Sequence, residues 1–555
     1  MRILPVLLIL LAAACSSPET QPVETLVVHN VNGYDLADGR VEPFSVLVVQ
    51  DGKVLAKGDS TLLAQYPDAP RRDGGGLTLL PGLIDAHAHI MGLGSSLMSV
   101  DLMGVATKQE ALARIKAFAD ANPTQEWIVG RGWNQTLWPE NAFPTAADLD
   151  AILPTRPVAL ERVDGHATWV NSRALELASV TKDTPNPDGG VILRDGSGAA
   201  SGVLIDRASS LVERVIPKPT PAARREALGR ALANIASNGL TSVHDAGISV
   251  ADWDLYKDFA DNGYLSTRIY AMISAAGSTF DTLAANGPVI GYADHMLTMR
   301  SVKLYADGAL GSRGAALMED YSDDKGNKGL LFYTTQELIP MFEKVSGKGF
   351  QINIHAIGDM ANRASLDAFD ALASKGADSG LRHRIEHAQV VAPTDIPRFK
   401  SLNLIASMQP THATSDKNMA VARVGIHRIR GAYAWRTYLE QGTIIASGSD
   451  FPVEAVNPFF GLYSAVTRMD FDGNPPGGWY PEHLMSRAEA LKSFTLDAAY
   501  AGHMEDVTGS LTPGKFADFI LIDRDYFEVP ASEIHQIKVM QTWVGGQQVY
   551  QRTDE

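Results

Sequence analysis

The sequence predicts an α/β protein in which a (β/α)8 TIM-like barrel is joined to a small β-sandwich built from both chain ends. Short β-branched segments alternate with helical stretches, such as residues 221–237, through the middle of the chain. Eight such alternations favour a closed barrel over an open sheet. The predicted barrel strands are residues 80–85, 240–244, 268–273, 301–305, 351–355, 383–387, 404–408 and 443–446.

The chain of 555 residues is too long for a single core, so several folding units are expected. Residues 25–80 and 505–553 contain short apolar strands separated by Gly and Asp turns, and these predict the β-sandwich. Residues 81–504 are predicted to form the barrel. Its first two strands are too far apart for one crossover, so an insertion is expected at about 105–225. We expect this insertion to overhang the active face of the barrel, where the loops that follow the strands lie.

Composition indicates an ordinary soluble enzyme, with 45% hydrophobic and 20% charged residues. The formal net charge of −16 and the absence of a basic patch argue against binding to nucleic acid. The partner we expect is a small-molecule substrate.

The first fifteen residues carry a targeting pattern. Arg2 precedes an apolar run from Ile3 to Ala14, which is too short for a comfortable membrane span and is followed by Cys15. The pattern resembles a bacterial lipoprotein signal (residues 1–15), with residues 16–24 as a flexible tether. It predicts a periplasm-facing lipoprotein of the bacterial cell envelope, in the outer membrane and attached only through a lipid on Cys15. A plain secreted protein is the alternative.

Several predicted barrel strands end in a residue that can bind a metal. Buried strands normally finish in turn residues, whereas these finish in an imidazole, an amine or a carboxylate. Because the carboxyl ends of barrel strands converge at one mouth, the pattern predicts a metal site there. The candidate ligands are His87, His89, Lys303, His355, His387 and Asp450.

These residues also carry a family resemblance. Residues 81–85 read Pro-Gly-Leu-Ile-Asp and lead directly into the pair His87 and His89. With the ordered strand ends that follow, the chain from Thr25 to about Tyr550 resembles the amidohydrolase superfamily, specifically its YtcJ-like group (amidohydrolase family 3). The resemblance implies that His87 and His89 bind the more buried of two divalent metals together with Asp450.

The resemblance assigns the remaining ligands in the same way. His355 and His387 would hold the second metal, and Lys303 would be carboxylated by CO2 to give a carbamate that bridges both ions. Zinc is the expected metal for such nitrogen and oxygen ligands. A homodimer is also compatible with the resemblance.

The implied chemistry is hydrolysis of a non-peptide C–N bond in an amide or N-acyl substrate. Metal ions would activate a hydroxide, and Asp450 would act as general base and then as general acid. Two alternatives within the superfamily stay open: deamination of a cyclic amidine, and hydrolysis of a cyclic amide or ester. A non-catalytic binding lipoprotein is the alternative from outside enzymes.

Five further residues are candidates for substrate binding. His244 ends the second predicted strand and could orient the substrate or make a structural hydrogen bond. His166 lies in a segment that resembles a YtcJ-like cover of the site. Asp307 and Arg313 could bind a substrate carboxylate or pair with each other, and Trp133 could wall an apolar pocket or simply pack.

Overall fold

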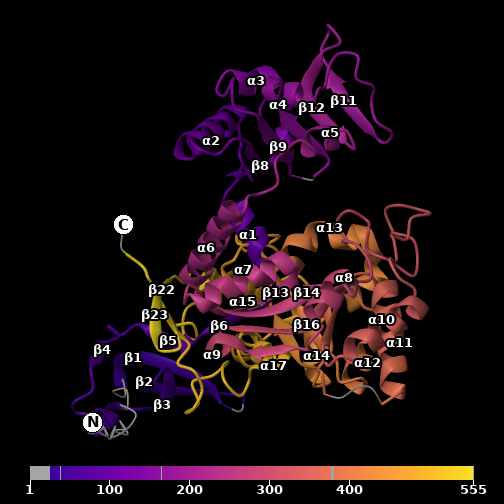
Figure 1. Ribbon diagram of the computed structural model, residues 1–555. Helices are drawn as coiled ribbons and strands as arrows, with labels where there is room; N and C mark the ends of the chain where they lie inside the picture. The colour runs from indigo at the N-terminus through magenta and orange to yellow at the C-terminus, as the bar shows by residue number, and fades with distance from the viewer. Residues whose placement is uncertain (1–24, 38, 164, 377–379, 554–555) are drawn as a thin grey trace, which may run out of the picture.

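The computed structural model describes residues 25–37, 39–163, 165–376 and 380–553, which form a barrel, a sheet built from both chain ends and an inserted lobe (Figure 1). The predicted signal, the tether and Cys15 lie outside the described residues. Within the described ranges, every helix is too short or too polar to cross a membrane.

The barrel consists of eight parallel strands, and the prediction of a (β/α)8 barrel is confirmed. Hydrogen bonds link neighbouring strands in chain order around a nearly closed sheet. Past the last strand, Asp450 N donates to His87 O at 2.8 Å, which ties the eighth strand end to the first. The strands are β6 (Leu83–Ala88), β13 (Leu240–Ile248), β14 (Arg268–Ser274), β16 (Leu297–Tyr305), β17 (Gln351–Ala356), β18 (Arg384–His387), β19 (Ile405–Met408) and β20 (Ile445–Ser447).

Helices surround the strands, and local sequence signals set where they begin. The Thr220 hydroxyl accepts from Ala223 N, and Pro221 takes the first helical position of its helix. Thr334 and Glu337 form a reciprocal capping box at the start of another. The main covering helices are α6 (Pro221–Ser237), α7 (Val250–Asp261), α8 (Ser278–Leu283), α10 (Thr335–Ser346), α11 (Asp359–Ser374), α12 (Ile396–Ser401), α13 (Pro410–Arg428), α14 (Trp435–Glu440), α15 (Pro458–Thr467), α16 (Arg487–Ser493) and α17 (Leu496–Ala501).

Both chain ends contribute to one eight-stranded sheet beside the barrel. β5 and β21 pair antiparallel, and this pairing joins the two ends of the chain. Phe519 and Trp543 stack in the apolar core with ring centroids 5.2 Å apart. A buried ion pair of 2.7 Å between Arg268 and Asp518 connects the sheet to the barrel. The strands are β1 (Thr25–Ala37), β2 (Arg40–Gln50), β3 (Lys53–Gly58), β4 (Arg71–Asp73), β5 (Thr78–Pro81), β21 (Phe519–Ile522), β22 (Val539–Val544) and β23 (Gln547–Gln551).

The insertion is a lobe with its own sheet and its own apolar cores, and it stands off from the barrel in Figure 1. The chain enters the lobe after α1 (Ile90–Ser96) and returns to the barrel through α6. These two helices pack so closely that a Cβ on Gly94 would lie 2.3 Å from Ala227 O. The lobe contains β7 (Val100–Asp101), α2 (Lys108–Ala121), β8 (Ile128–Trp133), α3 (Ala146–Asp150), β9 (Val158–Arg162), β10 (Ala167–Val170), α4 (Ser172–Leu177), β11 (Gly190–Arg194), β12 (Ala200–Asp206) and α5 (Ser210–Glu213).

A buried histidine next to β18 gives the fold a pH dependence. His383 Nδ1 accepts a hydrogen bond from Ile352 N at 3.0 Å, and burial together with nearby His503 lowers the pKa of His383 to about 4. Between pH 6.5 and 4 the unfolded chain therefore binds a proton that the folded chain does not, so stability falls as the pH falls. We expect this histidine alone to contribute on the order of 3 kcal/mol to that loss.

Denaturant titrations at pH 7 and pH 4.5 measure this effect. In the His383→Asn variant, which keeps an acceptor at the same position, the difference between the two pH values should shrink. An exposed control, His427→Gln, should leave the difference unchanged. Equal pH dependence in all three proteins would contradict the prediction.

Candidate metal centre

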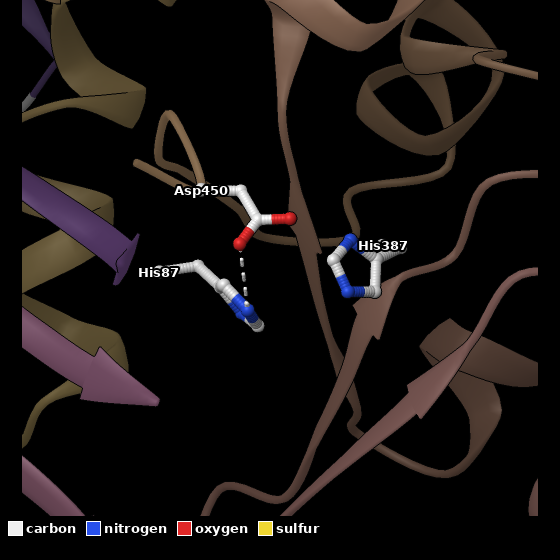
Figure 2. A group of neighbouring side chains, drawn as sticks. All are labelled: His87, His387 and Asp450. Carbon is white, nitrogen blue, oxygen red and sulfur yellow. Dashed lines mark ion pairs between the residues drawn. The ribbon is translucent and has the colours of Figure 1, made fainter. Parts of the chain in front are cut away.

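Three side chains that can bind a metal meet at the carboxyl ends of the barrel strands. His87 is on β6, His387 ends β18 and Asp450 follows β20. One ligand atom from each lies within 4.8 Å of the other two, and all three residues are buried. Figure 2 shows both rings turned toward the carboxylate, with His87 Nε2 at 3.7 Å from Asp450 Oδ1.

The other predicted ligands lie around the same centre. Lys303, near the end of β16, places Nζ 3.0 Å from His87 Nε2. His89 Nε2 is 3.2 Å from Asp450 Oδ1. The His355 ring at the end of β17 lies 4.5 Å from the His387 ring, centroid to centroid. The structure thus brings all six predicted ligands to one mouth of the barrel.

Hydrogen bonds orient the two central imidazoles. His87 Nδ1 bonds Glu386 Oε2, and His387 Nδ1 donates to Gln409 Oε1 at 2.8 Å. In each ring Nε2 is left facing the centre, which is the usual arrangement when a second group fixes a metal ligand. Burial lowers the pKa of His87 to about 4 and that of His387 well below its usual value. Both rings are therefore neutral, as metal ligands must be.

A buried carboxyl group, Asp85, fixes the backbone that carries Asp450. It accepts from His87 N at 3.1 Å, from Ser449 N at 3.1 Å and from Ser449 Oγ at 2.6 Å. Asp450 itself sits at φ 64°, in the left-handed region that few non-glycine residues adopt. The clamp holds this uncommon conformation, which directs the carboxylate to the centre.

The Asp450 carboxylate is kept ionised. Burial opposes its charge, but the neighbouring imidazoles of His412 and His89 hold the pKa of Asp450 well below the ordinary range. His412 lies between two carboxylates, with Nε2 3.3 Å from Asp450 Oδ2 and Nδ1 3.2 Å from Glu454 Oε1. Although burial disfavours its charge, these two partners raise the pKa of His412 to about 10.

The donor set suits a divalent cation. Within the described part of the chain, Asp450 Oδ1 and His355 Nε2 are buried without a hydrogen-bond partner. Buried polar atoms are normally paired, so two unpaired ones that face the same centre fit the ligand atoms of a cation. Imidazole nitrogen and carboxylate oxygen are the ligands that zinc takes in catalytic sites. The residues present therefore fit a metal.

The candidate substrate residues of the insertion lie within that lobe. Trp133 is fully buried, and its Nε1 donates to Leu160 O at 2.7 Å. It packs in the lobe's core against Trp138 and Trp169. His166 is 67% exposed and pairs with Asp206 at 2.9 Å. The roles of Trp133 and His166 in substrate binding stay predictions.

His244 is not at the mouth of the barrel. The predicted strand ended at this residue, but β13 continues to Ile248, so His244 lies halfway along the strand. Its side chain is fully buried, and its Nδ1 accepts from Arg384 Nη1 at 2.9 Å. These contacts favour a structural hydrogen bond of His244 over a role in orienting the substrate.

Asp307 and Arg313 do not pair with each other in the described structure. Asp307 is buried and accepts from the backbone N–H groups of Ala316, Ile357 and Gly358 at 2.8 to 3.0 Å. It also lies 3.4 Å from His355 Nε2. Arg313 instead bonds Asp323 at 3.0 Å. Asp307 therefore shapes the loop after β16 and borders the centre.

Three residues near the centre were not assigned a role from the sequence. Glu386 and Arg384 share one face of β18 and form a buried ion pair of 2.7 Å. Two charges inside a short buried strand were the signal that could have pointed to them. Tyr305, at the end of β16, is 40% exposed, and its ring lies 5.5 Å from that of His355.

Neutral imidazoles and a carboxylate converge at the strand ends of a parallel barrel. This arrangement is that of a metal-dependent enzyme with a (β/α)8 fold. The chain belongs to the amidohydrolase family, whose model matches residues 72–550, and it is therefore a hydrolase.

Relatives agree with this assignment. The putative amidohydrolase YtcJ of Bacillus subtilis is 30% identical over 91% of this chain and 96% of its own. N-substituted formamide deformylase of Arthrobacter pascens is 27% identical over 95% of this chain and 98% of its own. An uncharacterized metal-dependent hydrolase from Pyrococcus horikoshii has a crystal structure that matches with a TM-score of 0.76 at 28% identity, over 91% and 99% of the two chains.

Proposed function

We propose that this protein hydrolyses a non-peptide C–N bond in a small amide or N-acyl compound, using two divalent metal ions. The observation that carries the proposal is the buried convergence of His87, His387 and Asp450, with their ligand atoms within 4.8 Å. The similarity to a deformylase of N-substituted formamides supports an N-acyl substrate. Zinc is the expected metal, because the ligands offer nitrogen and oxygen.

A metal held here would supply Lewis acidity, which polarises a carbonyl and makes water a stronger nucleophile at neutral pH. Asp450 is ionised and can accept the proton of the attacking water. It can then return that proton to the leaving nitrogen, so that the C–N bond breaks to give an acid and an amine. His412 Nε2 lies 3.3 Å from Asp450 Oδ2 and helps to fix the direction of the carboxylate.

Lys303 is proposed to carry the carbamate. An uncharged amine attacks CO2 and loses a proton, which leaves an N-carboxylate that can hold two cations. Burial lowers the pKa of Lys303 to about 8, so roughly a tenth of it is uncharged at pH 7 before any modification. Its Nζ lies 3.0 Å from Nε2 of the His87 ring, which is one of the expected ligands.

Metal analysis combined with a substrate panel tests the function. We expect about two metal equivalents per chain, and turnover of N-substituted formamides or other N-acyl amines that stops after metal removal and returns with Zn2+. Cyclic amides, cyclic esters and cyclic amidines serve as comparison substrates. Turnover of only these comparison compounds would reject the proposal in favour of the alternative chemistry.

Tyr305 is expected to contact the apolar part of the substrate. It is an exposed aromatic residue beside the centre, and Lys303 Nζ lies 4.9 Å from its ring centroid. Tyr305→Ala should lower kcat/KM for substrates with a large apolar group by about 10- to 100-fold, because burying an aromatic ring is worth about 1.5–3 kcal/mol.

Steady-state kinetics with large and small N-substituents measures this effect. Tyr305→Phe, which keeps the ring, should resemble the wild type, and the smallest substrate should be affected little in either variant. An equal loss for all substrates would show that Tyr305 does not select the apolar group.

A further inference from the structure

A chain of buried polar side chains runs through the barrel interior beneath the metal centre. Arg384 Nη1 donates to His244 Nδ1 at 2.9 Å, and Arg384 Nε donates to Glu386 Oε1 at 2.7 Å. The second oxygen, Glu386 Oε2, bonds His87 Nδ1. All four residues are fully buried, and they come from the three strands β13, β18 and β6.

The guanidinium of Arg384 is fixed from several sides. Besides His244 and Glu386, it donates through Nη2 to Ala86 O at 2.6 Å and to Ser407 Oγ at 3.1 Å. Its partners therefore lie on β6, β13, β18 and β19. With Arg384 held in this way and bound to one carboxylate oxygen, the other oxygen of Glu386 is directed to His87.

Stability alone does not account for this ion pair. Two charges taken fully out of water lose their hydration, and replacing such a pair with apolar residues of similar size is often neutral or stabilising. The pair nevertheless ends on the ring that places Nε2 at the metal centre. A negative partner on Nδ1 selects the ring form with the proton on Nδ1, and it increases the basicity of Nε2.

We propose that Glu386 is a positioning residue for the metal centre, clamped by Arg384 and through it by His244. In this role it fixes the tautomer and the direction of the His87 ring and thereby sets metal affinity. The inference rests on the proposed function only in requiring that the centre binds a metal. It assigns His244 to the support of the centre, through its bond to Arg384.

The test measures Zn2+ affinity by competition with a chelator, together with the visible spectrum of the Co2+ form. Glu386→Met should weaken Zn2+ binding by about 10- to 100-fold and alter the Co2+ spectrum. It should also lower the melting temperature, because Arg384 is left as an unpaired buried charge. Glu386→Gln, which keeps an acceptor but no charge, should fall between this variant and the wild type.

The double variant Arg384→Met/Glu386→Met separates positioning from stability. It removes both charges, so the melting temperature should recover while Zn2+ affinity stays at least about 10-fold weaker. Recovery of affinity together with stability would overturn the proposal, as would wild-type affinity in Glu386→Met. A wild type that binds Zn2+ but cleaves no C–N substrate would reject the proposed function and leave this inference intact.

Discussion

Replacing Asp450 with Asn should reduce kcat/KM by about 10³-fold or more while the protein still folds. Asn has nearly the same shape, but it cannot accept the proton of the attacking water or return it to the leaving nitrogen. General acid–base catalysis by one group typically contributes 10²- to 10⁴-fold, and the loss of a charged metal ligand adds to this. The Asp450 backbone N–H, which donates to His87 O, is retained.

Kinetics and metal content should be measured on the same preparations of this variant. Asp497→Asn is the matched control, because Asp497 is also a buried aspartate but pairs with Lys492 away from the centre. The control should stay within a few-fold of wild type. A fully metal-loaded Asp450→Asn enzyme with nearly normal kcat would exclude Asp450 as the base.

Replacing Lys303 with Ala should lower the metal content from about two equivalents to one or fewer, and kcat/KM by at least about 100-fold. Loss of a group that merely supports a ligand already costs 10- to 100-fold, so loss of a bridging ligand should cost at least as much. A small carboxylate such as formate should enter the space that the side chain leaves and partly restore both values.

Elemental analysis with and without formate checks this outcome. Lys303→Met, which fills the space with an uncharged chain, is the matched control and should not respond to formate. Two retained equivalents in Lys303→Ala would contradict the carbamate bridge and indicate that the lysine serves another purpose.

The barrel and the position of the centre could be predicted because they depend on local pattern. A β-branched run that ends in His387 or Lys303 indicates both a buried strand and a functional group at its end. The eight predicted strands all occur in the structure, although β13 runs four residues beyond the predicted end. That extension moves His244 from the mouth into the interior, where Arg384 binds it.

Contacts between distant segments could not be predicted in the same way. Nothing near Trp133 in the sequence distinguishes a pocket wall from the core of the lobe, because both require a large apolar side chain. The charge of Glu386 inside a buried strand could be noticed, but its partner could not be predicted, because His87 lies 299 positions away in the chain. Burial and pairing of this kind depend on the folded arrangement, which a single sequence does not display.

The close packing of α1 against α6 has a consequence for how this enzyme can change. The chain leaves the barrel and returns to it through two adjacent helices, and the lobe between them has separate apolar cores. The lobe is thus an inserted unit whose two connections to the barrel, α1 and α6, lie side by side. It could be shortened, exchanged or replaced by a short linker while the eight strands and their metal ligands keep their places. New lobes could therefore arise during evolution without any change to the barrel and its metal centre.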